Sequence, residues 1–310
     1  MRLRTPVCSL LGIDVPVLQA GMSTNTTPEL VAAVSSAGGL GIIGGLNRTP
    51  DELRREIRRV RELTSRPFGV NHVVCLIDKA AVEMTIAQRV SVLSLAWGRA
   101  PDLTYQAHEA GIKVVHMVST PEEAGQVAAD GADVIVAQGT EGGGHVGTMS
   151  TLPLVPQVID VVGGVPVLAA GGIADGRGLA AVLMLGAQGA LMGTRFLATP
   201  EARGRGQSKD VILNALGSQT VASKFYDDVL GKVWPGAIVR SIQHPLLDEW
   251  GQRPQDWEEA ADQLRPSLEA AIAAGEFVLA GESSGLIHDI VPAGELVSRI
   301  AREAEALLGS

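Results

Sequence analysis

The chain has 310 residues, which is enough for one large barrel or two modest domains. Its net charge is −9 and its Lys and Arg residues form no long run, which argues against a nucleic-acid surface because such a surface needs clustered cations. No stretch of about 18 or more residues is continuously apolar, so no membrane span is expected. The N-terminal residues also lack the apolar core and cleavage site of a signal peptide.

The two cysteines, Cys8 and Cys75, form no CxxC motif and have no metal-ligand spacing. We therefore expect free thiols in a cytoplasmic protein. No cluster of His, Cys and carboxylate residues has the spacing of a metal site, so no metal is expected.

Apolar residues make up 46% of the chain and aromatic residues only 3%, and glycine occurs 37 times. This composition suits an α/β protein with buried parallel strands and tight turns. Up to about residue 198, one unit repeats: a short apolar run that ends in Gly or a polar residue, followed by an amphipathic stretch. The predicted strands cover 15–22, 40–45, 68–74, 90–98, 113–118, 134–138, 165–172 and 190–197. The predicted helices cover 28–37, 50–64, 78–88, 101–109, 121–130, 151–161 and 176–184.

Eight strands joined through helices imply parallel pairing with right-handed crossovers. The count of eight favours a closed (β/α)8 TIM barrel over an open sheet. Half of the ten aromatic residues lie between about residue 205 and residue 262, where this alternation is absent. We expect 205–262 to form a mostly helical lid over one mouth of the barrel, and 1–204 with 263–310 to form the barrel. The apolar spacing in 292–308 predicts a helix that closes the barrel wall.

In a (β/α)8 barrel the active site lies at the carboxyl ends of the strands. The segment 133–147 has the sequence DVIVAQGTEGGGHVG: a buried strand, then three consecutive glycines, then His145. Each of these glycines loses much backbone entropy on folding, which makes sense where the backbone must approach a flat or charged group closely. We interpret that group as a flavin with its phosphate. The alternative is a glycine-rich surface turn with a solvated histidine.

Glycines also follow the seventh and eighth predicted strands, in AAGGIADG (169–176) and LMGTRF (191–196). In this fold, these two loops commonly bind phosphate through backbone N–H groups. The chain has neither a GxxxxGK[ST] motif nor a GxGxxG motif after a strand. A mononucleotide of the flavin type therefore fits better than a dinucleotide on a domain of its own.

Several segments, in order along nearly the whole chain, resemble the nitronate monooxygenase family, also called 2-nitropropane dioxygenase-like. They are PVLQAGMS, FGVN, AQGTEGGGHVG, VLAAGGIADGRG, LMGTRFLATPEA and SSGLIHDIVPAGELV. FMN-dependent enoyl-acyl-carrier-protein reductases and some NAD(P)H:quinone reductases share the fold and much of this pattern.

The resemblance implies FMN as the cofactor and assigns its contacts. Met22 and Asn71 would touch the isoalloxazine, Gln138 and Gly143 would flank it, and Gly172 with residues 191–194 would hold the phosphate. The complete expected cofactor set stands at the strand ends: Ala20, Gly21, Met22, Asn71, Gln138, Gly143, Gly144, Gly171, Gly172, Leu191, Met192, Gly193 and Thr194.

His145 would be the family's histidine near flavin N5, acting as the base that takes the α-proton of a neutral nitroalkane or orienting a nitronate. An imidazole suits this role because it titrates near neutrality. The implied activity is oxidation of alkyl nitronates with O2. The alternative is an FMN-dependent NAD(P)H reductase of enoyl thioesters or quinones. The expected partners are these small molecules and not nucleic acid or membrane; a homodimer is possible.

The chain departs from its relatives at two positions. Gly142 stands where many of them have Ala, and Met117 stands after His116 where some nitronate-oxidising relatives have Lys. Other polar residues leave two interpretations open. Glu141 is a second acid/base or a ligand of the loop backbone, Arg195 pairs with a carboxylate or approaches the phosphate, and His72 and His116 are expected to be structural.

Overall fold

The computed structural model describes residues 3–204, 206–251 and 253–309. Its main sheet has eight parallel strands in the order β1-β9-β8-β6-β5-β4-β3-β2. A parallel bridge between Leu18 and Leu40 joins the two ends of this order and closes the barrel. The barrel strands are β1 Val17–Gln19, β2 Gly41–Gly44, β3 Phe68–Val73, β4 Val92–Ala96, β5 Lys113–Val118, β6 Val134–Gln138, β8 Val167–Ala170 and β9 Ala190–Met192. The predicted TIM barrel is confirmed.

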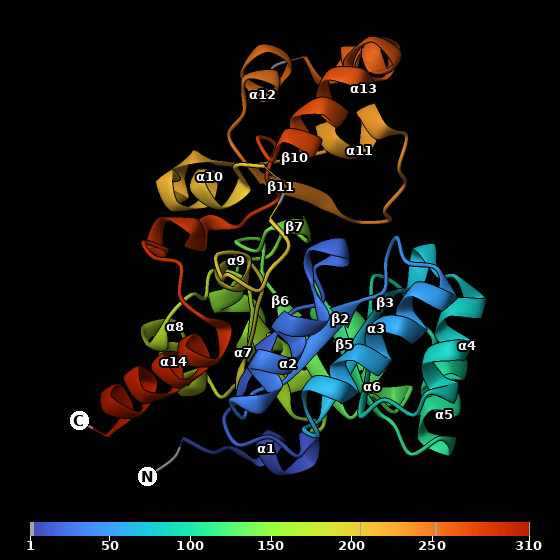
Figure 1. The fold of residues 1–310 in the computed structure, drawn as a ribbon, viewed down its shortest axis with the longest axis vertical. Coiled ribbons are helices and arrows are strands. Elements are labelled where there is room, and N and C mark those ends of the chain that lie inside the picture. The colour runs from blue at the N-terminus through green and yellow to red at the C-terminus, as the bar shows by residue number, and fades with distance from the viewer. Residues whose placement is uncertain (1–2, 205, 252, 310) are drawn as a thin grey trace.

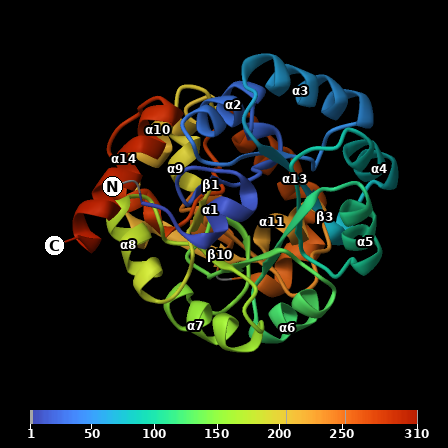
Figure 2. The same cartoon turned by 90° about the horizontal axis from the view of Figure 1, so that it is seen from below.

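Helices surround this sheet as a ring (Figure 2). They are α2 Pro28–Ser36, α3 Pro50–Leu63, α4 Lys79–Ala87, α5 Pro101–Glu109, α6 Pro121–Ala129, α7 Thr151–Val161 and α8 Gly176–Met184. Hydroxyl groups of Thr27, Thr49 and Thr120 cap the first turns of α2, α3 and α6 by accepting backbone N–H bonds. The predicted strand–helix alternation is therefore present with boundaries within a few residues of those expected.

The far end of the barrel from the lid is covered by α1 Pro6–Leu11, which lies across the centre of the ring in Figure 2. Val7, Cys8 and Leu11 are buried there against side chains that fill the barrel interior, among them Val115 and Val136. Cys8 and Cys75 are both free thiols, as expected. Side chains thus fill the bottom of the barrel, and a ligand is expected at the opposite mouth.

The last helix, α14 Ala293–Leu308, lies alongside α8 (Figure 1) and also contacts α2. Leu296, Val297 and Ile300 are buried in the largest core cluster of the molecule. The helix therefore takes the position that the eighth barrel helix would occupy, as predicted for 292–308.

The eighth barrel strand is shorter than expected. It ends at Met192 instead of residue 197, and Thr194–Leu197 forms the short helix α9. Gly193 and Thr194 therefore follow the strand and do not lie within it. The apolar residues of this helix continue the strand's apolar run, which hid the break in the sequence.

The lid stands above the barrel mouth (Figure 1) and is mostly helical. Its elements are α10 Ser208–Asn214, β10 Thr220–Ser223, α11 Phe225–Leu230, β11 Ile238–Ile242, α12 Pro245–Trp250 and α13 Trp257–Ala274. Short 3-10 helices also occur along the whole chain. They are η1 Ser23–Asn25, η2 Val74–Leu76, η3 Gly217–Gln219, η4 Pro254–Asp256 and η5 Glu282–Leu286. The boundaries 205 and 262 remain a proposal: residue 205 lies outside the described residues, and α13 continues past 262.

The lid also contains a small antiparallel sheet that the sequence did not predict. Its order is β10-β11-β7, and β7 Gly144–Val146 comes from the loop after β6 of the barrel. Val239 of β11 pairs with His145. The candidate histidine therefore belongs to the same sheet as the lid. No helix among the described residues has both the length and the apolar character needed to span a bilayer.

Candidate functional site

A cavity of about 290 Å³ lies at the carboxyl ends of the barrel strands, beneath the lid. This volume is near the lower end of the range for small-molecule sites. All the residues that we expected to bind cofactor or to act in catalysis line this one cavity: Ala20, Gly21, Met22, Asn71, Gln138, Gly143, Gly144, His145, Gly171, Gly172, Leu191, Met192, Gly193 and Thr194. The structure thus brings them together, while their individual roles remain predictions.

Glycines give the wall after β8 and β9 its shape. Gly171 and Gly172 have φ values of +97° and +74°, a backbone conformation that favours glycine. A side chain at Gly193 would meet nothing closer than Met22 Sδ at 3.7 Å, so its absence leaves room beside the backbone. These positions form a cradle of bare main chain, which suits a phosphate.

Two buried polar atoms of the cavity lining have no hydrogen-bond partner among the described residues. They are Oε1 of Gln138, an acceptor, and Nε1 of Trp234, a donor. Buried polar groups are normally hydrogen-bonded, so each marks a place where a bound ligand can supply the missing partner. Together with the glycine cradle, they fit a flat polar group with an anionic tail.

His145 is held by lid residues on two sides. Its ring stacks on Trp234 with centroids 3.6 Å apart and an interplanar angle of 14°. Its Nε2 atom lies 3.0 Å from both carboxylate oxygens of Asp227, which belongs to α11. The side chains of His145 and Asp227 are only 12% and 7% exposed. The solvated surface histidine that we considered as an alternative is therefore not what the structure shows.

Trp97 completes an aromatic wall next to the histidine. Its ring meets those of His145 and Trp234 edge-on, at centroid distances of 6.5 Å and 6.1 Å. Its φ is +60°, which is rare for a bulky residue and implies backbone strain. The backbone N–H of Cys75 donates to the Trp97 carbonyl (2.9 Å) and Nε2 of His116 to the Gly98 carbonyl (2.9 Å), so both bonds hold this turn.

His72 and His116 are structural, as expected. His72 points away from the cavity that Asn71 lines, and its Nε2 lies 2.9 Å from Thr85 Oγ1 on α4. Burial lowers the pKa of His72 to about 4 and also lowers the pKa of His116, because a buried charged imidazole loses its hydration. The ring of His72 is therefore not poised to exchange protons near neutral pH.

The contacts of Glu141 and Arg195 also decide between the two interpretations of each residue. The Glu141 carboxylate accepts hydrogen bonds from the backbone N–H and the hydroxyl of Thr151, both at 2.9 Å, and so holds the loop after β6 to the start of α7. Arg195 donates to the Asp289 carbonyl (3.0 Å) and forms an ion pair with its carboxylate (3.1 Å). Glu141 thus binds the loop backbone and Arg195 pairs with a carboxylate.

Different constraints explain the three consecutive glycines. At Gly143 a Cβ atom would lie 2.6 Å from main-chain atoms of Ala280 and Gly281, where the chain returns from the lid. Gly144 has φ of +75°. At Gly142 the nearest contact would be 3.2 Å, to the side-chain atom Cγ1 of Val146. The run is needed for close backbone packing and for the turn into β7.

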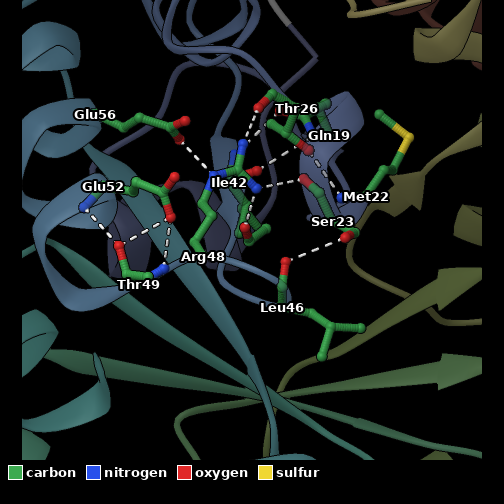
Figure 3. A network of polar contacts seen from close by, with 11 residues as sticks. Gln19, Met22, Ser23, Thr26, Ile42, Leu46, Arg48, Thr49, Glu52 and Glu56 are labelled. Carbon is green, nitrogen blue, oxygen red and sulfur yellow. Dashed lines mark hydrogen bonds and ion pairs between the residues drawn. The ribbon is translucent and has the colours of Figure 1, made fainter. Parts of the chain in front are cut away.

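A buried arginine fixes the opposite wall, near Met22 (Figure 3). The guanidinium of Arg48 donates to the carbonyls of Ser23 and Thr26, both at 2.6 Å, and to that of Gly44. Its Nε forms an ion pair with Glu56 at 2.7 Å. One side chain thus ties the loop after β1 to the end of β2 and keeps this part of the cavity rigid.

The sequence analysis missed the residues that the lid contributes. Tyr226, Lys232 and Trp234 line the cavity, and Asp227 holds its histidine. The enrichment of aromatic residues in the lid was a usable signal for Tyr226 and Trp234. Nothing local distinguishes Asp227 from Asp228, because its partner lies 82 residues earlier in the chain.

Comparison with known proteins identifies the family of the chain. The sequence profile described as "Nitronate monooxygenase" matches residues 4–81 and 76–303. The chain is an oxidoreductase with a TIM-barrel fold. The chain is a member of the nitronate monooxygenase family, which is in general flavin-dependent.

The chain is similar to several proteins that carry different names. A Mycobacterium tuberculosis protein named as a hydroxy-methyl-oxo-octahydroindene-carboxyl-CoA dehydrogenase is 42% identical over 78% of this chain and 69% of its own length. FabK from Thermotoga maritima has a TM-score of 0.87 and 36% identity, with 99% and 98% of the two chains covered. Nitroalkane oxidase from Streptomyces ansochromogenes has a TM-score of 0.83 and 30% identity, with 96% and 97% covered.

Proposed function

We propose that this protein is an FMN-dependent enzyme that oxidises alkyl nitronates, and neutral nitroalkanes, with O2. The observation that carries the proposal is the common cavity: a glycine cradle, two unpartnered polar atoms and His145 all line it. The similarity to a nitroalkane oxidase supports the substrate class.

The residues of the cavity fit FMN. The phosphate would be held by backbone N–H groups of Gly171, Gly172, Gly193 and Thr194. The unpartnered side-chain Oε1 of Gln138 would accept a hydrogen bond from the flavin ring. Bound FMN would supply the redox chemistry that links substrate oxidation to the reduction of O2. The protein supplies position, exclusion of water and proton transfer.

His145 is the proposed base. A neutral nitroalkane must lose its α-proton, and a positioned imidazole accepts it: the C–H bond breaks, an N–H bond forms on the ring, and the electron pair stays on the substrate as the nitronate. The buried indole N–H of Trp234, next to His145, is a donor available to a nitro oxygen.

Replacing His145 by Ala tests this role. We expect turnover of a neutral nitroalkane to fall by ~10²–10⁴-fold because the base is lost. Turnover of a preformed nitronate should fall much less, and flavin content should be unchanged. Steady-state rates on both substrate forms measure the difference, and equal rates for wild type and variant on the neutral nitroalkane would exclude His145 as the base.

A second candidate is an FMN-dependent NAD(P)H reductase of enoyl thioesters or quinones. Similarity to a carboxyl-CoA dehydrogenase at 42% identity favours the thioester version. Anaerobic mixing of the flavin-loaded protein with NADH or NADPH separates the candidates. Rapid bleaching of the visible flavin band supports the reductase, and an unchanged band supports nitronate oxidation.

A further inference from the structure

Asp227 is the one acidic side chain that the structure places against the ring of His145 within hydrogen-bond distance among the described residues. It lies on α11 of the lid, and both its carboxylate oxygens are 3.0 Å from Nε2. Asp227 as a whole is only 5% exposed. A carboxylate buried this deeply is normally kept for a specific partner, because desolvation makes an unpaired charge costly.

The chemistry of the contact determines the tautomer of the histidine. An ionised carboxylate only accepts hydrogen bonds, so Nε2 must carry the proton. A neutral imidazole has one N–H group, and Nδ1 is therefore the nitrogen with the free lone pair. The stack on Trp234 and the pairing of β7 with β11 restrict rotation of the ring and of its backbone.

We propose that Asp227 is a positioning residue that holds His145 in its Nε2–H tautomer, so that Nδ1 is the nitrogen that accepts the substrate proton. This inference rests on the proposed function, in which His145 is the base. When Nδ1 takes the proton, the ring becomes positively charged, and the Asp227 carboxylate beside it compensates that charge. Asp227 itself neither gains nor loses a proton.

The contact between Asp227 and His145 also links the lid to the proposed proton transfer. Asp227 and Trp234 both come from the lid, whereas His145 follows a barrel strand. The correct tautomer is therefore present only while Asp227 of α11 contacts His145 of β7. Displacement of the lid would remove the acceptor and the stacking partner of His145 together.

The test compares Asp227→Asn with Asp228→Asn, an exposed aspartate next to it on the same helix. An Asn side chain keeps the size of Asp, but its amide N–H can donate to Nε2 and so stabilise the opposite, Nδ1–H tautomer. We would label all histidines of the flavin-loaded full chain with ¹⁵N and identify His145 as the signal lost in His145→Gln. Imidazole ¹⁵N shifts then report which nitrogen carries the proton.

The expected result is an Nε2–H ring in the wild type and in Asp228→Asn, and an Nδ1–H ring in Asp227→Asn. Turnover of a neutral nitroalkane should fall ~10²–10⁴-fold in Asp227→Asn, with KM and flavin affinity unchanged. Turnover of a preformed nitronate should change far less, because it needs no proton abstraction.

An Nδ1–H ring in the wild type would overturn the inference without any variant. So would an unchanged tautomer and unchanged neutral-substrate turnover in Asp227→Asn. If the wild type oxidises no nitro compound, the proposed function fails, but the tautomer measurement still decides whether Asp227 positions the ring.

Discussion

His72 and His145 show how the surroundings of an imidazole decide its use. His145 lines the cavity and pairs with a carboxylate, whereas His72 faces the barrel's helical layer and meets the hydroxyl of Thr85. That hydroxyl already donates to the Ala81 carbonyl at 2.9 Å, so Nε2 of His72 is the donor in its own contact. Burial lowers the pKa of His72 and so keeps its ring neutral near pH 7, as part of the packing between β3 and α4.

The lowered pKa of His72 makes stability depend on pH. The folded pKa is about 4, below the ordinary value of 6.5, because burial opposes the charged ring. Between these pH values the unfolded chain binds the additional proton, so stability is fully present above about pH 6.5 and falls as the pH drops towards 4. His72 alone should reduce the free energy of unfolding by about 2 kcal/mol between pH 7 and pH 5.

Urea unfolding at both pH values measures this effect. In His72→Gln the loss between pH 7 and pH 5 should shrink by about 2 kcal/mol. The exposed His288→Gln is the matched control. A variant with the same pH slope as the wild type would show that His72 does not cause the dependence.

The individual site residues were predictable where their position follows from the barrel. Met22, Gln138 and Gly172 stand at strand ends, and parallel strands bring such ends to one rim. Asp227 was not predictable, because its role arises from a contact across the lid that leaves no local pattern.

At the scale of elements, the loop after β6 does more than present a histidine. It continues into β7, which adds an edge strand to the lid's sheet through Ile238, Val239 and Arg240 of β11. Arg240 also donates to the carbonyl of Thr140 at 2.7 Å. The loop is thus fixed by backbone pairing and by a side chain, which explains how a glycine-rich segment can hold the ring of His145 in place.

The glycine run offers a matched pair of variants. Gly143→Ala should destabilise the protein by about 1–3 kcal/mol and lower flavin affinity, because main-chain atoms of Ala280 and Gly281 cannot move aside easily. Gly142→Ala should change stability by less than about 1 kcal/mol, because its closest contact is a side-chain methyl and Ala restricts the unfolded chain. Urea unfolding and the flavin retained after gel filtration compare the two; equal effects would contradict this account.

The barrel strands and helices could be predicted because apolar runs and caps have a local cause. The break between β9 and α9 could not, since Phe196 and Leu197 extend the apolar run into the helix. The strands of the lid were equally hidden, because β10 and β11 are short and gain their stability from pairing with each other and with β7.

For the whole molecule, the wall of the barrel depends on a helix that is separated from its preceding barrel strand by the entire lid. The chain leaves β9, builds the lid, and returns to place α14 between α8 and α2. Residues near the C-terminus therefore complete a core that begins with the first strand, and barrel and lid are expected to unfold together.

Ile300 tests this dependence. It is 1% exposed on α14, so Ile300→Ala should lower the free energy of unfolding by about 2–5 kcal/mol. Met184 on the neighbouring α8 is 77% exposed, and Met184→Ala should change it by less than about 0.5 kcal/mol. If the barrel and the lid unfold together, tryptophan fluorescence, which comes mainly from the lid, and far-UV circular dichroism should report the same transition in Ile300→Ala. Separate transitions would show that they unfold independently.

The overall architecture was predictable because eight apolar runs alternating with helices allow few topologies. The contact between the lid and the barrel was not predictable, because it depends on a sheet formed from segments about 90 residues apart in sequence.

The pairing of β7 with β11 has a consequence for how this scaffold can be altered. Most residues that surround the His145 ring belong to one continuous segment of the lid. The glycine cradle belongs to a different segment of the chain. Exchanging that lid segment between relatives would therefore replace the surroundings of the His145 ring in a single step and leave the glycine cradle unchanged. Chimeric proteins made by such an exchange would retain their yellow colour while accepting different compounds.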